Sequence, residues 1–183
     1  MGWHSRARNF ISIAHKQDGA AAVEFAMILP VLIVTLFGVI EIGRLLNDFH
    51  VVSKSVRDAT RYLTRVPMDC PSGGPSSGPL SSYLVNSGDE PNARNLALTG
   101  SPAAPTAPGD YLLPYWTDAT TISVTVNCVA NGGQFEGVYA GVANIPRITV
   151  SATVPFTFLW GALVLDSSAI TMSIVHNEVS VGE

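Results

Sequence analysis

The apolar positions of this 183-residue chain are concentrated in one run near its start. From Phe25 to Ile40 the sequence FAMILPVLIVTLFGVI carries no charged residue, and Glu24 and Glu41 bound the run. A helix needs about 20 predominantly apolar residues to cross a bilayer, and the neighbouring small residues extend this run to that length. The pattern predicts a transmembrane helix over residues 20–43, with a buried core helix as the alternative.

Two residues of this predicted helix are unusual. A carboxylate inside a span costs about 2.5 kcal/mol or more on insertion scales, so Glu24 is expected to have a function. The alternative is that Glu24 lies at the interface and marks the cytoplasmic end of the span. Pro30 removes a backbone donor, and we expect it to kink the helix.

Beyond the span, apolar residues recur at alternating steps of three and four, which predicts an amphipathic helix over residues 44–66. Pro67 then ends the helix. The apolar seam can pack on the chain's own strands, which we favour because they need cover, or form a coiled coil with a partner subunit. The seam consists of Ile42, Leu45, Phe49, Val52, Val56, Ala59, Leu63 and Val66, and the charged residues off it are Arg44, Asp48, Lys54, Arg57, Asp58, Arg61 and Arg65.

Residues 67–118 form a region rich in proline, glycine and serine, and they hold nine of the twelve prolines. Such composition predicts loops. A short helix is expected within it, around Glu90–Leu98. The aromatic pair Tyr115 and Trp116 is interpreted as a packing anchor rather than a ligand platform.

Three segments of the final region, residues 119–183, alternate strictly between apolar and polar positions. This period of two predicts an antiparallel sheet with one wet face. With the long helix, it gives an α+β, pilin-like architecture in which the helix packs on a small C-terminal sheet. The apolar positions are Ile122, Val124, Val126 and Cys128 in the first segment, Ile148, Val150, Ala152, Val154, Phe156 and Phe158 in the second, and Ile170, Met172 and Ile174 in the third.

The apolar run FTFLWGALVL, residues 156–165, is too short to span a bilayer. It has two interpretations that stay open. It is either the end of a strand followed by a hairpin, or a hydrophobic patch that meets a partner or the membrane.

The composition agrees with a single membrane-spanning helix. Only 13% of residues are charged, against about 25% in an ordinary soluble domain, and the mean hydropathy is +0.30. The hydrophobic fraction of 47% is ordinary, so the apolar excess is local and a multi-spanning protein is excluded. A net charge of −4 and a pI near 5.5 argue against nucleic acid as a partner.

The segment before the span, residues 1–19, is basic, with Arg6, Arg8 and Lys16 against Asp18. It does not resemble a removable secretory signal, because the apolar run exceeds an h-region of about 7–15 residues and no A-x-A-like site follows. Residues 44–65 are basic as well, so flanking charge alone does not decide the orientation.

The junction DGAAAVEF, residues 18–25, resembles the processing site of type IV prepilins. The longer string GAAAVEFAMILPVLIVTLFGVIEIGRLLNDFHVVSKSVRDATRYLTR, which begins at Gly19, resembles the TadE-like proteins. These are minor pilins or pseudopilins of the Tad (Flp, type IVb) pilus system. The resemblance covers roughly residues 18–65, with a looser likeness in the C-terminal strands and none in the middle.

The resemblance implies a processed membrane protein. A prepilin peptidase would cut between Gly19 and Ala20 and place Glu24 fifth and Phe25 sixth in the mature chain. The new α-amino group, with a pKa of about 7.7–8.0, can pair with the Glu24 carboxylate one turn away or in a neighbouring subunit. The family's role implies initiation or assembly of a Tad-type pilus for surface adhesion.

The resemblance also implies the setting and the partners. The chain would cross the bacterial inner membrane once, with a cytoplasmic N-terminus and a periplasmic C-terminal domain. Its partners would be the membrane, prepilin peptidase, TadF-like minor pilins, the major Flp pilin and the inner-membrane assembly platform.

Chemistry-bearing motifs are few. Cys70 and Cys128 form a disulfide in an oxidising compartment, or stay two thiols with Cys128 in the core. The cysteines and four histidines have no zinc-site spacing, so no metal and no cofactor is expected. The G-x-S-x-G match at residues 74–78 lacks the strand and helix of a nucleophile elbow. The chain is therefore expected not to be an enzyme; an uncleaved envelope scaffold and, remotely, a membrane-tethered hydrolase using Ser76 are the alternatives.

Overall fold

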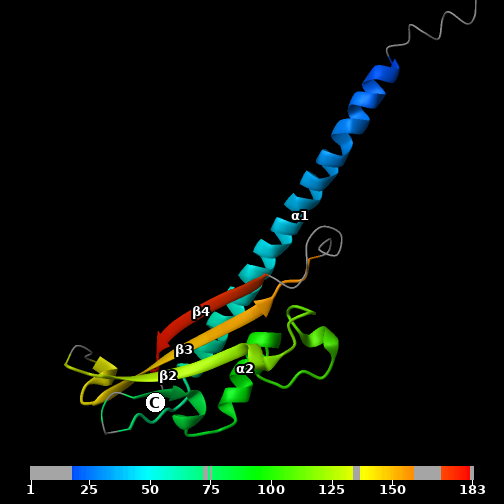
Figure 1. Cartoon of the computed structure of the whole chain (residues 1–183). Coiled ribbons are helices and arrows are strands. Elements are labelled where there is room, and N and C mark those ends of the chain that lie inside the picture. The colour runs from blue at the N-terminus through cyan, green and yellow to red at the C-terminus, as the bar shows by residue number, and fades with distance from the viewer. Residues whose placement is uncertain (1–17, 72–73, 75, 134–136, 159–169, 182–183) are drawn as a thin grey trace, which may run out of the picture. The chain divides into compact units, whose positions relative to one another are not determined.

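A computed structural model describes residues 18–71, 74, 76–133, 137–158 and 170–181 (Figure 1). The chain divides into two compact units, Met1–Gly43 and Arg44–Glu183. One helix, α1 (Asp18–Leu63), contributes to both units. Each unit is described by itself.

The first unit consists, in its described part, of residues 18–43 of α1. These side chains are almost all exposed, from Val23 at 58% to Met27 at 74% and Val39 at 69%. Only 6% of the most apolar 18-residue window is buried, and its mean hydropathy is 2.5. A core helix would be covered, so the alternative of a buried core helix does not fit. The helix is long and apolar enough to cross a membrane.

The second unit contains a four-stranded sheet in the order β1-β2-β3-β4. The strands are β1 (Ser76–Pro79), β2 (Ile122–Ala130), β3 (Asn144–Pro155) and β4 (Thr171–Val179), and all neighbours are antiparallel. In the register, Val126 lies opposite Ile148, and Ala152 lies opposite Ile174. The expected α+β class, with a long N-terminal helix and a C-terminal antiparallel sheet, is confirmed.

The core lies between the inner face of the sheet and α1. Alternate residues of β2 and β3 are buried, as the period of two requires. The largest fully buried side chains include Leu63, Trp116, Ile122, Ile148 and Phe156. The opposite face carries mainly serine, threonine and asparagine, which are polar without being charged.

The end of α1 differs from the prediction. The helix ends at Leu63 rather than at Val66, and a turn closed by the Val66 N–H on the Leu63 carbonyl leads to Pro67. The Thr64 carbonyl at this end accepts the Val181 N–H at 2.9 Å. Val181, the second residue after β4, therefore satisfies one of the carbonyls that a helix end leaves free.

The proline-rich region is more ordered than a loop. It contains α2 (Asp89–Thr99), close to the predicted Glu90–Leu98, and β1, which the sequence did not predict. Helix α2 begins with acidic residues in its first turn and ends at Gly100, whose φ of 77° suits glycine.

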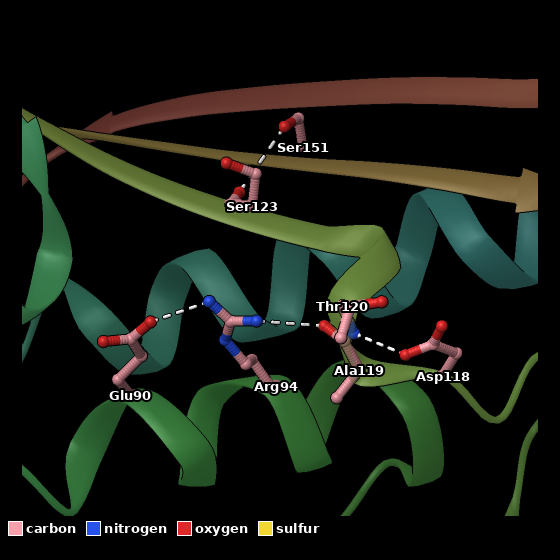
Figure 2. A network of polar contacts seen from close by, with 7 residues as sticks. All are labelled: Glu90, Arg94, Asp118, Ala119, Thr120, Ser123 and Ser151. Atoms are coloured by element: carbon pink, nitrogen blue, oxygen red, sulfur yellow. Dashed lines mark hydrogen bonds and ion pairs between the residues drawn. The ribbon is translucent and has the colours of Figure 1, made fainter.

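Arg94 holds α2 against the start of β2 (Figure 2). Its guanidinium pairs with Glu90 at 2.7 Å and donates to the Ala119 carbonyl at 3.0 Å. Asp118 accepts from the Thr120 N–H at 2.8 Å and fixes the turn that leads into β2. A single arginine thus connects two segments that are 25 residues apart.

Of the apolar run 156–165, only its first residues are described. Phe156 is buried and Phe158 packs edge-on against it, with ring centroids 5.0 Å apart. Residues 159–165 lie outside the described residues, so the choice between a hairpin and a partner-facing patch stays open.

Candidate functional site

The predicted processing junction lies in the first turns of α1. Gly19 and Ala20 are both helical and exposed, and Glu24 and Phe25 follow one turn later, also exposed. Residues four apart lie on the same face of a helix, so Ala20 and Glu24 are neighbours along α1. The rest of the leader, residues 1–17, lies outside the described residues.

Two residues in the middle of the apolar stretch affect its hydrogen bonding, which matters because a membrane offers no partner there. Pro30 lies inside α1, which continues through it, so the helix lacks one N–H there. The Thr35 hydroxyl donates to the Leu32 carbonyl at 2.9 Å, so it needs no partner outside the helix. The kink expected at Pro30 stays a prediction.

The apolar seam packs mainly on the chain's own domain. Val52, Val56, Ala59 and Leu63 are between 0% and 1% exposed and belong to the hydrophobic core. The favoured interpretation, cover for the sheet, is confirmed for this part. Two seam positions are corrections: Ile42 is 59% exposed and Phe49 is 43% exposed. At Phe49 the buried face of the helix shifts by one position, to Asp48.

Asp48 explains this shift. It was placed off the seam by its charge, yet it is 8% exposed and its carboxylate accepts the Tyr115 hydroxyl at 2.5 Å. Burial, followed by the hydrogen bond to Asp48, raises the pKa of Tyr115 above its usual value. Nearby, the Arg44 guanidinium lies 5.6 Å from the centroid of the Phe156 ring, a cation–π arrangement. The hydrogen-bonded pair of Asp48 and Tyr115 therefore occupies the space that a continuous apolar seam would use.

The aromatic pair acts as the predicted packing anchor. Trp116 is 1% exposed and donates from its indole nitrogen to the Thr121 hydroxyl at 2.8 Å. Tyr115 is half-buried through its bond to Asp48. Buried Trp and Tyr side chains need such polar partners.

The two cysteines are brought together. Cys70, in the segment after α1, and Cys128, on the buried face of β2, form a disulfide with a Cα–Cα distance of 5.8 Å. The two cysteines are 58 positions apart in the sequence, and the bond encloses β1 and α2. It attaches the helix end to the middle of the sheet.

The G-x-S-x-G pattern has no elbow geometry in the residues described. Ser76 begins the edge strand β1 and lies opposite Cys128 in β2, whereas an elbow serine stands in a turn between strand and helix. In the described ranges, no group of three or more His, Cys, Asp or Glu side chains is arranged for a metal.

Fold and site together define a class of protein. The described residues contain one apolar helix of spanning length, which is exposed and lies near the N-terminus, and a small α+β domain closed by a disulfide. This arrangement fits a single-pass membrane protein.

The comparisons narrow this class. The model of the TadE-like protein family matches residues 19–61, which are nearly the whole of α1, so the predicted resemblance is confirmed over this segment. Over these residues the chain is similar to TadE-like proteins, which is consistent with a protein of Tad pilus systems. No curated protein and no solved structure was found to match it.

Proposed function

We propose that this protein is a minor pilin or pseudopilin that supports initiation and assembly of a Tad-type (type IVb) pilus used in surface adhesion. A prepilin peptidase would cleave it between Gly19 and Ala20. The proposal assigns it no catalytic role and no cofactor.

The observation that carries the proposal is the placement of Gly19. A Cβ atom added there meets nothing within 4 Å, and Gly19 is not among the glycines with positive φ. Glycine inside a helix costs about 1 kcal/mol relative to alanine, so the fold gains nothing from it. A peptidase that accepts only a small residue at the cut would account for glycine at this position.

Glu24 supports the same interpretation. After cleavage the positive α-amino group of Ala20 would stand one helical turn before the Glu24 carboxylate. Both charges would enter the apolar phase together, and their pairing would offset the cost of removing each from water. Between neighbouring subunits the same pair would set the axial register of packed helices.

The disulfide supports export of the second unit. Disulfides persist in oxidising compartments such as the bacterial periplasm and are rare in the cytosol. We therefore place the C-terminal domain in the periplasm and the leader in the cytoplasm. Other Tad minor pilins, the major Flp pilin and the inner-membrane assembly platform would be its partners.

The decisive test is the N-terminal sequence of the protein purified from cells with an active prepilin peptidase. We expect the mature chain to begin at Ala20 and Gly19→Leu to abolish this cut. Gly38→Leu is the matched control, since Gly38 is also in α1 with nothing within 4 Å of an added Cβ. It should be cleaved normally.

A chain that keeps Met1 in those cells would overturn the proposal. That result would favour an uncleaved single-pass scaffold of the envelope machine instead.

A further inference from the structure

The outer face of α1 in the second unit carries a row of exposed basic side chains. We call this row the basic stripe. On a helix of 3.6 residues per turn, its helical members fall within an arc of about 60°, and the last follows in the turn after α1. The stripe consists of His50, Lys54, Arg57, Arg61 and Arg65, all of them exposed.

The stripe is opposite the packed face of the helix. The buried residues Val52, Val56, Ala59 and Leu63 are centred about 200° away from it around the helix axis. The packed face is thus used by the chain's own core, and the stripe points away from it.

Among the described residues of the chain, the side chains of the stripe form no ion pair with a carboxylate. Apart from α1 and the stripe, the described lysines and arginines of this unit are Arg94, which pairs with Glu90, and Arg147 on β3. Like charges at helical spacing repel one another by a few tenths of a kcal/mol per pair. Four formal positive charges collected on one face, in a chain of net charge −4, therefore carry a cost that an acidic partner would remove.

We propose that the basic stripe is a docking surface for an acidic helix of another protein subunit. The spacing of the stripe residues favours a helix over a strand as the partner. Successive stripe members lie three or four residues apart, about 4.5–6 Å along α1, which matches carboxylates at i, i+3 and i+4 of a second helix. Same-face residues of a strand repeat at about 6.6–6.8 Å and would lose register over four contacts.

A bilayer surface fits the stripe poorly. From His50 to Arg65 the stripe extends about 22 Å along α1, and its helical members stay within an arc of about 60°. Such a long, narrow row of charges matches a single helix better than the broad, flat layer of headgroups at a membrane surface.

A shallow depression at the far end of the stripe adds shape to the charge. Asp58, Arg61, Tyr62, Arg65 and Val66 line it. The walls are mainly apolar, so a partner helix with one apolar side chain beside its acidic row would fill it. Asp58, and Asp89 behind the Tyr62 hydroxyl, would disfavour a carboxylate at that spot, so the acidic row is expected to lie over Arg57 and Arg61.

The test uses the full chain in neutral detergent and two labelled synthetic helical peptides of identical composition. One peptide carries its glutamates on a single face beside one leucine, and in the other they are scattered around the helix. Fluorescence anisotropy should show tighter binding of the single-face peptide. The double variant Arg57→Glu, Arg61→Glu should weaken it about tenfold or more, as expected for two reversed ion pairs.

The control is Arg147→Glu, which reverses an exposed charge on the sheet and should leave the affinity within about twofold. A peptide with lysines in place of the glutamates should prefer the double variant. An unchanged disulfide and circular-dichroism spectrum would show that the double variant is folded.

Equal binding of both peptides, or equal losses in the double variant and in Arg147→Glu, would overturn the proposal. So would displacement of the peptide by vesicles of anionic lipid but not of neutral lipid, which would assign the stripe to the membrane. Self-association of the wild type that the double variant lacks would assign it to a second copy. The test uses purified, uncleaved protein, so its result is independent of processing at Gly19.

Discussion

At the scale of single residues, the chain places two carboxylates where carboxylates are costly, and the structure supplies a partner for one of them. Asp48 is buried in the second unit and accepts the Tyr115 hydroxyl. Glu24 stands exposed on the apolar helix. We propose that its partner is the amino group that cleavage creates.

The partner of Glu24 can be tested without blocking cleavage. Glu24→Ala should leave the cut after Gly19 intact and remove most surface pili, because a buried α-amino charge would lose its counter-charge. Glu24→Asp keeps the charge on a shorter side chain and should retain part of the pili. The measurement is pilus number per cell by electron microscopy, and normal piliation of Glu24→Ala would refute the pairing.

The hydrogen bond between Tyr115 and Asp48 predicts that the free energy of unfolding depends on pH in the alkaline range. In the unfolded chain tyrosine ionises near pH 10, whereas in the folded chain the pKa of Tyr115 is raised. Above about pH 10 the folded state therefore binds more protons than the unfolded state, and stability must fall as pH rises. Burial also raises the pKa of Tyr62 and Tyr139, so these residues contribute to the same trend.

Tyr115→Phe should reduce this alkaline loss and cost about 1–3 kcal/mol at neutral pH, because Asp48 stays buried without its donor. Urea unfolding of the full chain in detergent at neutral pH and above pH 10 measures both effects. If Tyr115→Phe lost stability above pH 10 as steeply as the wild type does, the attribution of this loss to Tyr115 would be wrong.

At the scale of elements, α1 serves two environments with one continuous helix. Its first part exposes nearly every apolar side chain, and its second part buries a seam against the sheet. The two parts therefore differ in what an apolar side chain contributes to the stability of the folded domain.

Val56→Ala should lower the free energy of unfolding by about 1.5–3 kcal/mol, since Val56 is 0% exposed and truncation leaves a cavity. Val85→Ala is the matched control at 63% exposure and should change stability by less than about 0.5 kcal/mol. Thermal unfolding in detergent compares them. Equal effects would mean that the seam does not pack on the sheet.

The sequence predicts the elements with strong periodicity. The spacing of Val52, Val56 and Leu63 gave the packed helix, and strict alternation gave β2, β3 and β4 within a few residues. Strand β1 was missed because four residues, SSGP, with glycine and proline carry no alternation and have low strand propensity. Only the register with Thr125–Cys128 makes them a strand.

The candidate site likewise contains some features that the sequence predicts and others that it does not. The junction at Gly19 and the seam are local patterns, so the sequence alone predicts them. The Asp48–Tyr115 bond joins residues 67 positions apart, and no local pattern predicts which tyrosine reaches a buried acid. The signal that could have indicated it is the position of Asp48 beside the seam.

At the scale of the whole chain, long-range bonds hold the second unit closed. The disulfide joins Cys70 to Cys128, and the end of β4 bonds to the end of α1. The segment between the two cysteines contains β1 and α2 and contributes buried residues such as Leu80, Leu98 and Trp116 to the core. The disulfide stabilises this arrangement mainly by restricting the unfolded chain.

Removal of the disulfide should therefore be costly. In the chain-entropy treatment a closed loop of this length contributes about 4 kcal/mol, which Cys70→Ala should remove. Reductant should lower the melting temperature of the wild type to that of Cys70→Ala and should leave the variant unchanged. A wild type that is insensitive to reductant while fully reduced would contradict this prediction.

The bond between the two ends of the domain has a mechanical consequence. Val181 and Ser180 both donate to the Thr64 carbonyl, at 2.9 and 3.4 Å, and so connect positions that are more than a hundred residues apart along the chain. A pulling force applied through α1 is shared at Thr64 between the covalent backbone and these two hydrogen bonds. Part of the tension thus enters the sheet at its β4 edge, whereas the covalent chain beyond Pro67 leads to β1 at the opposite edge.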